Sequence, residues 1–427
     1  MTIAIEGCAV ATVAGEVLPD GHVVVEGSRI AAVGAGPARS PGVDRRIDAS
    51  GRLATPGLIN CHHHLYQSAT RGLAQQATLF EWLKELYPVW ARIDERLERA
   101  AARAGLATLL RSGCTTASDH HYVFPRDGGD LLAVEVEAAR ELGIRFHPCR
   151  GAMDLGASAG GLPPDAITED RDAILAAYAD ALSRFHDPAP GAMCRVALAP
   201  CSPFSVTREL MVESAELARA RGVRLHTHMA ETVEEEAYCL ELFGMRPVEY
   251  LEDTGWLGDD VWLAHCVHLD DAEVARFGET GTGVAHCPSS NARLGAGIAP
   301  VAPLVAAGAA VGLGVDGAAS NEGGELAGEL RQALYVARLR GGPAALTAAQ
   351  ALELGTLEPG KLADLVLWRL DGLDRAGIAD PVAALVLGAP PPADLVMVNG
   401  EIVVEDGELR TADAEALARE LAEVALT

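Results

Sequence analysis

Lysine is almost missing from this sequence of 427 residues, in which only Lys84 and Lys361 occur. The chain has 34 Lys and Arg residues against 60 Asp and Glu residues, which gives a formal net charge of -26. Binding to a nucleic-acid polymer requires clustered cations that neutralise phosphates. The acidic balance therefore argues against nucleic acid as a partner.

Long hydrophobic runs are also absent, although hydrophobic residues make up 49% of the chain. No uninterrupted apolar run reaches the roughly 18–20 residues of a membrane span, so no membrane partner is expected. The segment from Met1 to Gly15 lacks the basic start of a signal peptide. The nine cysteines form no CxxC pair, which indicates reduced thiols in a cytoplasmic protein.

The two ends of the chain differ in pattern from its middle. Apolar and polar residues alternate at both ends, as in short antiparallel strands, which predicts one small β-sandwich accessory domain from residues 1–53 and 356–427. The runs are Thr2–Ile5, Gly21–Glu26, Arg29–Val33, Ala363–Trp368, Asp394–Asn399 and Glu401–Glu405.

Residues 54–355 repeat a short apolar run followed by an amphipathic stretch. Eight such runs with helical patterns between most of them predict a (β/α)8 TIM barrel, which makes the whole chain an α/β protein. The runs are Ala54–Asn60, Cys114–His120, Ile144–Arg150, Arg195–Ala199, Val223–His228, Val261–His265, Gly283–His286 and Ala310–Asp316. After Thr347–Leu354 little room is left for a full last helix, so this helix is short or a segment is absent.

Metal-binding side chains stand at the ends of several predicted strands. His62 and His64 follow the first strand and share one face, because residues two apart in an extended chain point the same way. His228 ends the fifth strand, His265 the sixth and Asp316 the eighth. Barrel active sites form at the carboxyl ends of the strands. Imidazoles and a carboxylate there predict one divalent ion, Zn²⁺ or alternatively Fe²⁺.

These motifs resemble the amidohydrolase superfamily, and within it the cytosine/guanine deaminase branch. They read PGxxxxHxH from Pro56, HxxE at 228–231, AHC at 264–266 and GVDG at 314–317. The resemblance covers nearly the whole chain and implies a metal-dependent aminohydrolase. It implies that His62, His64, His228 and Asp316 bind one divalent metal, that Glu231 shuttles protons, and that His265 orients and polarises the attacking water.

The scarcity of lysine separates two subclasses of that superfamily. Binuclear members usually bridge their two metals with a carboxylated lysine on the fourth strand. The fourth run here, Arg195–Ala199, has no lysine, and Pro200-Cys201-Ser202-Pro203 follows it. A mononuclear aminohydrolase is therefore favoured, although a Cys201 bridge stays open.

Four residues are candidates for substrate contacts. Gln67 completes an HxHxxQ motif, and its amide can donate to one ring atom and accept from its neighbour. Arg150 could hold an anionic or carbonyl edge of the substrate, or it could form a structural ion pair. Tyr66 and Cys201 could face the ring or simply pack in the core. His120, His226 and His286 are expected to support the site or line the pocket.

The segments His62–Arg71 and Ala199–Phe204 look most like the bacterial 8-oxoguanine deaminases. This resemblance implies a small-molecule substrate and the reaction of 8-oxoguanine with water to give urate and ammonia. Alternatives are an N-alkylaminohydrolase acting on hydroxytriazines, and a deaminase acting on isoxanthopterin or guanine. A non-enzymatic paralogue is also conceivable, but such paralogues tend to lose ligands that are present here. Relatives are often dimers or larger, so a homo-oligomer is possible.

Overall fold

The catalytic part of the chain is a closed barrel of eight parallel strands. The computed structural model describes all residues except 13–16, 41, 354–360 and 427. Its strands pair in the circular order β10-β11-β12-β13-β6-β7-β8-β9. They are β6 (Leu58–Asn60), β7 (Cys114–His121), β8 (Arg145–Ala152), β9 (Ala197–Pro200), β10 (Leu225–Met229), β11 (Val261–His265), β12 (Gly283–His286) and β13 (Val311–Leu313). The predicted TIM barrel is confirmed.

The first predicted strand is wrong in its extent, because the chain changes sheets within it. β5 (Arg52–Pro56) pairs with the accessory sheet, whereas β6 belongs to the barrel. Between them Gly57 donates to Asp364 O on one side, and Leu58 donates to Gly113 O on the other. A Cβ atom at Gly57 would lie 2.0 Å from Thr115 Oγ1. This crossing therefore requires glycine, a packing constraint that the apolar pattern does not reveal.

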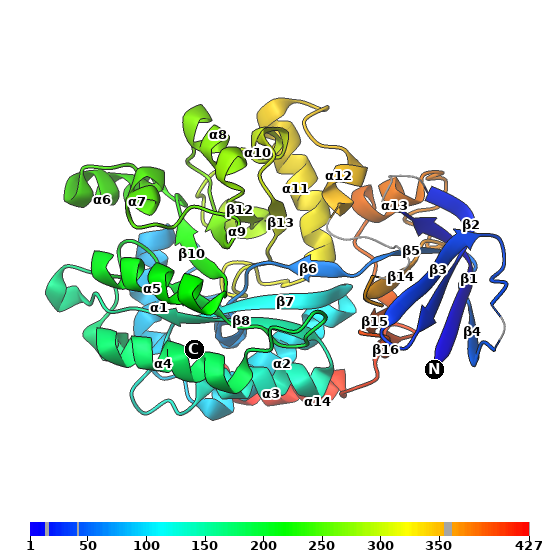
Figure 1. The fold of residues 1–427 in the computed structure, drawn as a ribbon, viewed down its shortest axis with the longest axis horizontal. Helices are drawn as coiled ribbons and strands as arrows, with labels where there is room; N and C mark the ends of the chain where they lie inside the picture. Colours follow the sequence, from blue (N-terminus) through cyan, green and yellow to red (C-terminus); the bar gives the residue numbers. More distant parts are fainter. Residues whose placement is uncertain (13–16, 41, 354–360, 427) are drawn as a thin grey trace.

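Helices surround the barrel and cover its strands (Figure 1). The amphipathic stretches between strands form them, and several begin at a capping side chain, such as Asp94 of α2, which accepts from Leu97 N. Those of the barrel region are η1 (Leu65–Thr70), α1 (Leu79–Trp90), α2 (Glu95–Arg111), α3 (Leu131–Leu142), η2 (Ala157–Ala159), η3 (Asp165–Ile167), α4 (Arg171–Phe185), α5 (Arg208–Arg221), α6 (Val233–Phe243), α7 (Pro247–Asp253), α8 (Asp271–Thr280), α9 (Pro288–Arg293), α10 (Val301–Ala307) and α11 (Leu326–Gly341).

Both ends of the chain build a separate mixed sheet beside the barrel (Figure 1). Its path is β17-β16-β15-β14-β5-β1-β2-β3, with β4 paired to β1. The six predicted strands pair antiparallel with their neighbours, as expected, whereas β1 also pairs in parallel with β4 and β5, which the patterns of the two chain ends did not identify. The strands are β1 (Thr2–Ala11), β2 (Val17–Glu26), β3 (Arg29–Ala35), β4 (Arg45–Asp48), β14 (Leu365–Arg369), β15 (Ala393–Val398), β16 (Glu401–Glu405) and β17 (Glu408–Leu409).

The C-terminal segment returns to the barrel after the sheet. α12 (Ala348–Leu352) is short, which is one of the two alternatives that the sequence left open. Residues 354–360, which include the predicted domain boundary at 355/356, lie outside the described part. α13 (Pro381–Leu387) lies beside α12, whereas α14 (Ala414–Val424) packs on α2. Arg103 of α2 forms an ion pair with Glu420, and Leu426 N donates to Ala69 O.

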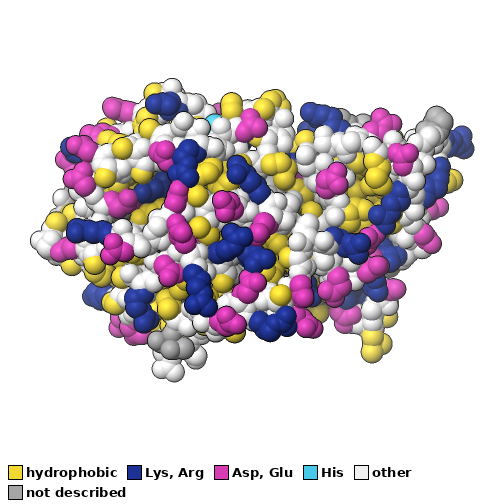
Figure 2. Space-filling model, turned by 90° about the horizontal axis from the view of Figure 1, so that it is seen from below, with side chains coloured by type: hydrophobic (Ala, Val, Ile, Leu, Met, Phe, Trp, Pro, Cys, Tyr) yellow, Lys and Arg dark blue, Asp and Glu magenta, His cyan; other side chains and the backbone are white. Residues whose placement is uncertain are grey.

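The surface seen in Figure 2 carries basic and acidic side chains in alternation rather than one basic patch. Exposed ion pairs such as Arg99–Glu141 and Arg184–Asp130 join side chains of opposite charge at the surface. All nine cysteines are free thiols. Among the described residues, no helix is both long and apolar enough to cross a membrane.

Candidate active site

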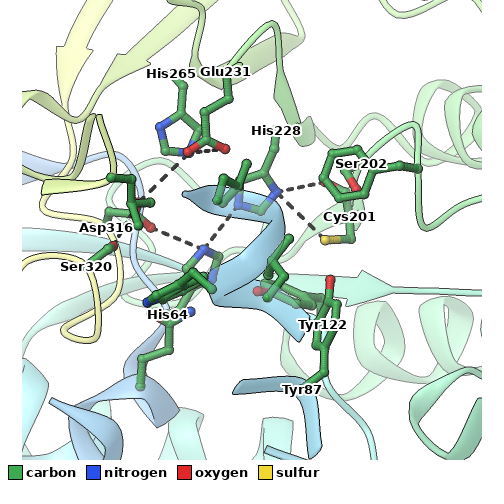
Figure 3. Close-up of a pocket in the computed structure, with 16 residues that line it drawn as sticks. His64, Tyr87, Tyr122, Cys201, Ser202, His228, Glu231, His265, Asp316 and Ser320 are labelled. Atoms are coloured by element: carbon green, nitrogen blue, oxygen red, sulfur yellow. Dashed lines mark hydrogen bonds and ion pairs between the residues drawn. The ribbon is translucent and has the colours of Figure 1, made fainter. Parts of the chain in front are cut away.

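Five predicted metal-site side chains converge at the carboxyl end of the barrel (Figure 3). Asp316 Oδ1 lies 3.3 Å from both His62 Nε2 and His64 Nε2. His64 Nε2 in turn lies 3.1 Å from His228 Nε2, and Asp316 Oδ2 lies 3.9 Å from His265 Nε2. All of these side chains are buried. The strand ends bring together residues that are more than 250 positions apart in the sequence.

Hydrogen bonds fix which nitrogen of each histidine faces the centre. His226 Nδ1 donates to Trp262 O, so its Nε2 must accept a proton from His62 Nδ1 at 2.8 Å. This leaves the lone pair on His62 Nε2, which has no other hydrogen-bond partner among the described residues. His64 and His228 donate from Nδ1 to His120 O and Cys201 O, both at 2.7 Å. Three Nε2 lone pairs therefore face one another.

These residues fit a divalent cation. Burial lowers the pKa of His62 well below its usual range and that of His228 to about 3, which keeps both imidazoles neutral and able to coordinate. Burial opposes ionisation of Asp316, but the neighbouring His62 and His64 side chains hold the pKa of this carboxyl well below its usual range. Ligand atoms of His62, His265 and Asp316 all lie within 4.8 Å of one another. Imidazole bonded through its far nitrogen to a backbone carbonyl is a common arrangement of metal ligands.

Glu231 lies beside this centre in a position suited to holding a proton. Its Oε2 is 3.6 Å from His265 Nε2. Burial, and then repulsion by Asp316, raises the pKa of Glu231 well above its usual range. Glu235 fixes the backbone here, because its carboxylate accepts from Ala230 N at 2.7 Å and from Glu231 N at 2.9 Å.

Further contacts hold His265 and Asp316 in place. His265 Nδ1 donates to Asn291 Oδ1 at 2.9 Å, and Ser290 Oγ donates to Asp316 Oδ2 at 2.6 Å. His265 and Asp316 have φ angles of 74° and 65°, which residues other than glycine rarely adopt. A strained backbone conformation of this kind costs about 1–3 kcal/mol of stability per residue, and such conformations are concentrated at functional sites. The sequence patterns gave no sign of Asn291, Ser290 or this strain.

A cavity opens onto the centre. Of the four predicted substrate-contact residues, Gln67 and Cys201 line it. The Gln67 amide is buried, and neither its oxygen nor its nitrogen has a hydrogen-bond partner among the described residues. Tyr66 is buried outside the lining, with its ring 5.4 Å from that of Trp90.

Arg150 is placed away from this cavity. Its guanidinium forms two hydrogen bonds with the Glu169 carboxylate and stacks on Phe124, 3.5 Å from the ring centroid. It lines a separate cavity on the outside of the barrel. Of the two interpretations that the sequence left open, the contacts support the structural ion pair. The sequence pattern placed Arg150 on a strand, but it did not identify Glu169, 19 positions later, as its partner.

No lysine approaches the candidate metal centre. β9 contains none, and both Lys84 of α1 and Lys361 are exposed. The Cys201 thiol lies 3.9 Å from His228 Nδ1, and burial raises its pKa to about 12, so it stays protonated in the protein without metal. This environment does not favour a bridging thiolate.

Comparison with known proteins agrees with these features. The Amidohydrolase family pattern matches residues 53–403. The chain belongs to the amidohydrolase family. It is 48% identical over 415 residues to the 8-oxoguanine deaminase of Pseudomonas aeruginosa, covering 93% of this chain and 92% of that protein. It is 38% identical to the hydroxydechloroatrazine ethylaminohydrolase of Pseudomonas sp. strain ADP, over 87% and 82% of the two chains.

A solved structure shares the same fold. The atrazine chlorohydrolase of Arthrobacter aurescens TC1, crystallised with zinc, superposes with a TM-score of 0.93 at 36% identity over 99% of each chain. This amidohydrolase is therefore a hydrolytic enzyme with a candidate site for a divalent metal, and zinc is present in a related structure.

Gly317 controls the position of Gln67, which gives a testable prediction. A Cβ atom at Gly317 would lie 1.8 Å from Gln67 Oε1, so Gly317→Ala must displace the amide. We expect an intact fold and a kcat/KM that falls about 10- to 100-fold for every good substrate, since small misplacements near the chemistry are costly. Gly323→Ala is the matched control, because its nearest neighbour would be 3.8 Å away. Equal kinetics for the two variants would show that the Gln67 position is unimportant.

Proposed function

We propose that this amidohydrolase removes the amino group of a purine-like heterocycle by hydrolysis, with 8-oxoguanine as the substrate. Water and 8-oxoguanine give urate and ammonia. The observation that carries the proposal is the convergence of Glu231, His265 and most of the candidate ligands on a small cavity that is also lined by the Gln67 amide, which has no hydrogen-bond partner among the described residues. The 48% identity to an 8-oxoguanine deaminase supports the choice of substrate.

We assign His62, His64, His228 and Asp316 as ligands of one divalent ion, most simply Zn²⁺. When bound, the ion supplies Lewis acidity and lowers the pKa of a water molecule to about 7. Asp316 accepts the proton of the attacking water, because its carboxylate stays ionised. His265 polarises and orients this water, and its ring is held in turn by Asn291.

Glu231 then moves protons between water and substrate. As water adds to the carbon that bears the amino group, Glu231 donates a proton to the adjacent ring nitrogen, which becomes basic when the ring loses its aromaticity. Asp316 then passes the proton it took from water to the amino nitrogen, and Glu231 takes the proton of the new hydroxyl group as it becomes a carbonyl. The C–N bond breaks and the group leaves as ammonia. Glu231 and Asp316 divide this work because their surroundings move their pKa values in opposite directions.

A panel of substrates tests the proposal. We expect 8-oxoguanine to be deaminated with a higher kcat/KM than guanine, isoxanthopterin or a hydroxytriazine, and Gln67→Ala to affect 8-oxoguanine and guanine alike. The reaction is followed by the loss of ultraviolet absorbance of the substrate and by the release of ammonia. Turnover of a hydroxytriazine with none of the purines would favour the second candidate, an N-alkylaminohydrolase, which the 38% identity to a triazine aminohydrolase supports.

A further inference from the structure

One wall of the catalytic cavity comes from α1, which the motifs did not identify. Leu79, Trp82, Leu83 and Tyr87 all line the cavity from this helix. Leu83 and Tyr87 follow Leu79 at intervals of four residues and Trp82 follows it by three, which places all four on one broad face of the helix. A capping box between Thr78 and Glu81 fixes where the helix begins, and therefore which side chains point inward.

Two of these side chains carry polar atoms that lack partners. Trp82 and Tyr87 are only 3% and 1% exposed, and neither Trp82 Nε1 nor the Tyr87 hydroxyl has a hydrogen-bond partner among the described residues. Trp90, on the next turn of the same helix, differs because its Nε1 donates to Thr70 Oγ1 at 3.2 Å. A buried donor without a partner is costly, and because both side chains line the cavity, these donors point to an acceptor on the ligand.

The chemistry of these groups restricts what they can recognise. An indole N–H can only donate. Burial raises the pKa of Tyr87 well above its usual range, so its hydroxyl stays protonated and can donate. Neither group is charged, and together they suit a neutral carbonyl oxygen rather than an anion or a cation.

Tyr87 lies at the far end of the cavity from the reacting groups. In Figure 3, Asp316, His265 and Glu231 lie on one side of His64 and His228, whereas Tyr87, Tyr122 and Cys201 lie on the other. The carbon under attack must lie near Glu231 and Asp316. A bicyclic substrate held this way directs its second ring toward α1.

We propose that Trp82 and Tyr87 donate hydrogen bonds to a carbonyl oxygen on the second ring of the substrate, and that this subsite selects oxidised heterocycles over their parent compounds. The inference rests on the proposed deaminase function. It predicts a higher kcat/KM for 8-oxoguanine than for guanine, and for isoxanthopterin than for pterin, because the two members of each pair differ by that carbonyl and the accompanying N–H.

Tyr87→Phe tests this subsite, because it removes only the hydroxyl. We expect kcat/KM for 8-oxoguanine to fall roughly 5- to 10-fold, as for the loss of one neutral hydrogen bond, while kcat/KM for guanine stays within about twofold. The isoxanthopterin-to-pterin ratio should fall in parallel. Tyr178→Phe is the matched control, since Tyr178 is also fully buried but lies in α4 outside the cavity lining. It should leave both ratios unchanged.

Trp82→Phe is a second, independent variant and should lower the same ratios. These measurements distinguish failure of the proposed deaminase function from failure of the proposed donor subsite. A wild-type enzyme that turns over none of the four bicyclic compounds overturns the proposed function and this inference with it. If the wild type deaminates 8-oxoguanine in preference to guanine and either variant keeps the wild-type ratio, the donor subsite is overturned while the deaminase function stands.

Discussion

Glu231→Gln is expected to preserve the fold and the bound metal but to lower kcat about 10²- to 10⁴-fold, the usual contribution of general acid–base catalysis. Glutamine has nearly the same shape but can neither accept nor release the proton that the reaction moves. Glu231 is the group best placed for this transfer, because it lies 3.6 Å from His265 and burial keeps its pKa raised.

The measurement is steady-state kinetics together with metal analysis of the same preparation. Glu234→Gln is the matched control, since Glu234 is an exposed neighbour at the start of α6 and should behave as wild type. If Glu231→Gln turned over substrate at nearly the wild-type rate, another group would have to carry the proton.

His228→Ala is expected to lower both metal content and activity sharply. The wild type should contain close to one divalent ion per chain, because the candidate ligands surround one centre and no lysine lies near it. Losing a ligand removes the Lewis acid, whose contribution of several kcal/mol corresponds to a loss of roughly 10³-fold or more. His22→Ala in β2 of the accessory sheet is the control and should keep metal and activity.

Metal analysis of the purified proteins, followed by removal of metal with a chelator and restoration with zinc, measures this effect. Two tightly bound ions per active wild-type chain would contradict the mononuclear site. Full occupancy and activity in His228→Ala would show that this histidine is not a ligand.

The sequence determined the barrel and the positions of its candidate metal-site side chains, because both depend on local patterns. Apolar runs become strands wherever they stand, and residues at the ends of parallel strands must meet at one rim. His62, His64, His228, His265 and Asp316 could therefore be found from strand ends alone, and the structure brings all five together.

Only the tertiary structure decided which neighbours each of these side chains has. Arg150 lies in β8 and Gln67 follows β6, yet Arg150 pairs with Glu169 away from the cavity and Gln67 lines the cavity. The split between β5 and β6 depends on Thr115 packing against Gly57, and the cavity wall formed by Trp82 depends on how α1 docks. Periodicity in the sequence indicates that a residue will be buried. Its contact partners come from segments far apart in the chain, and local sequence patterns carry no information about which of these segments pack together.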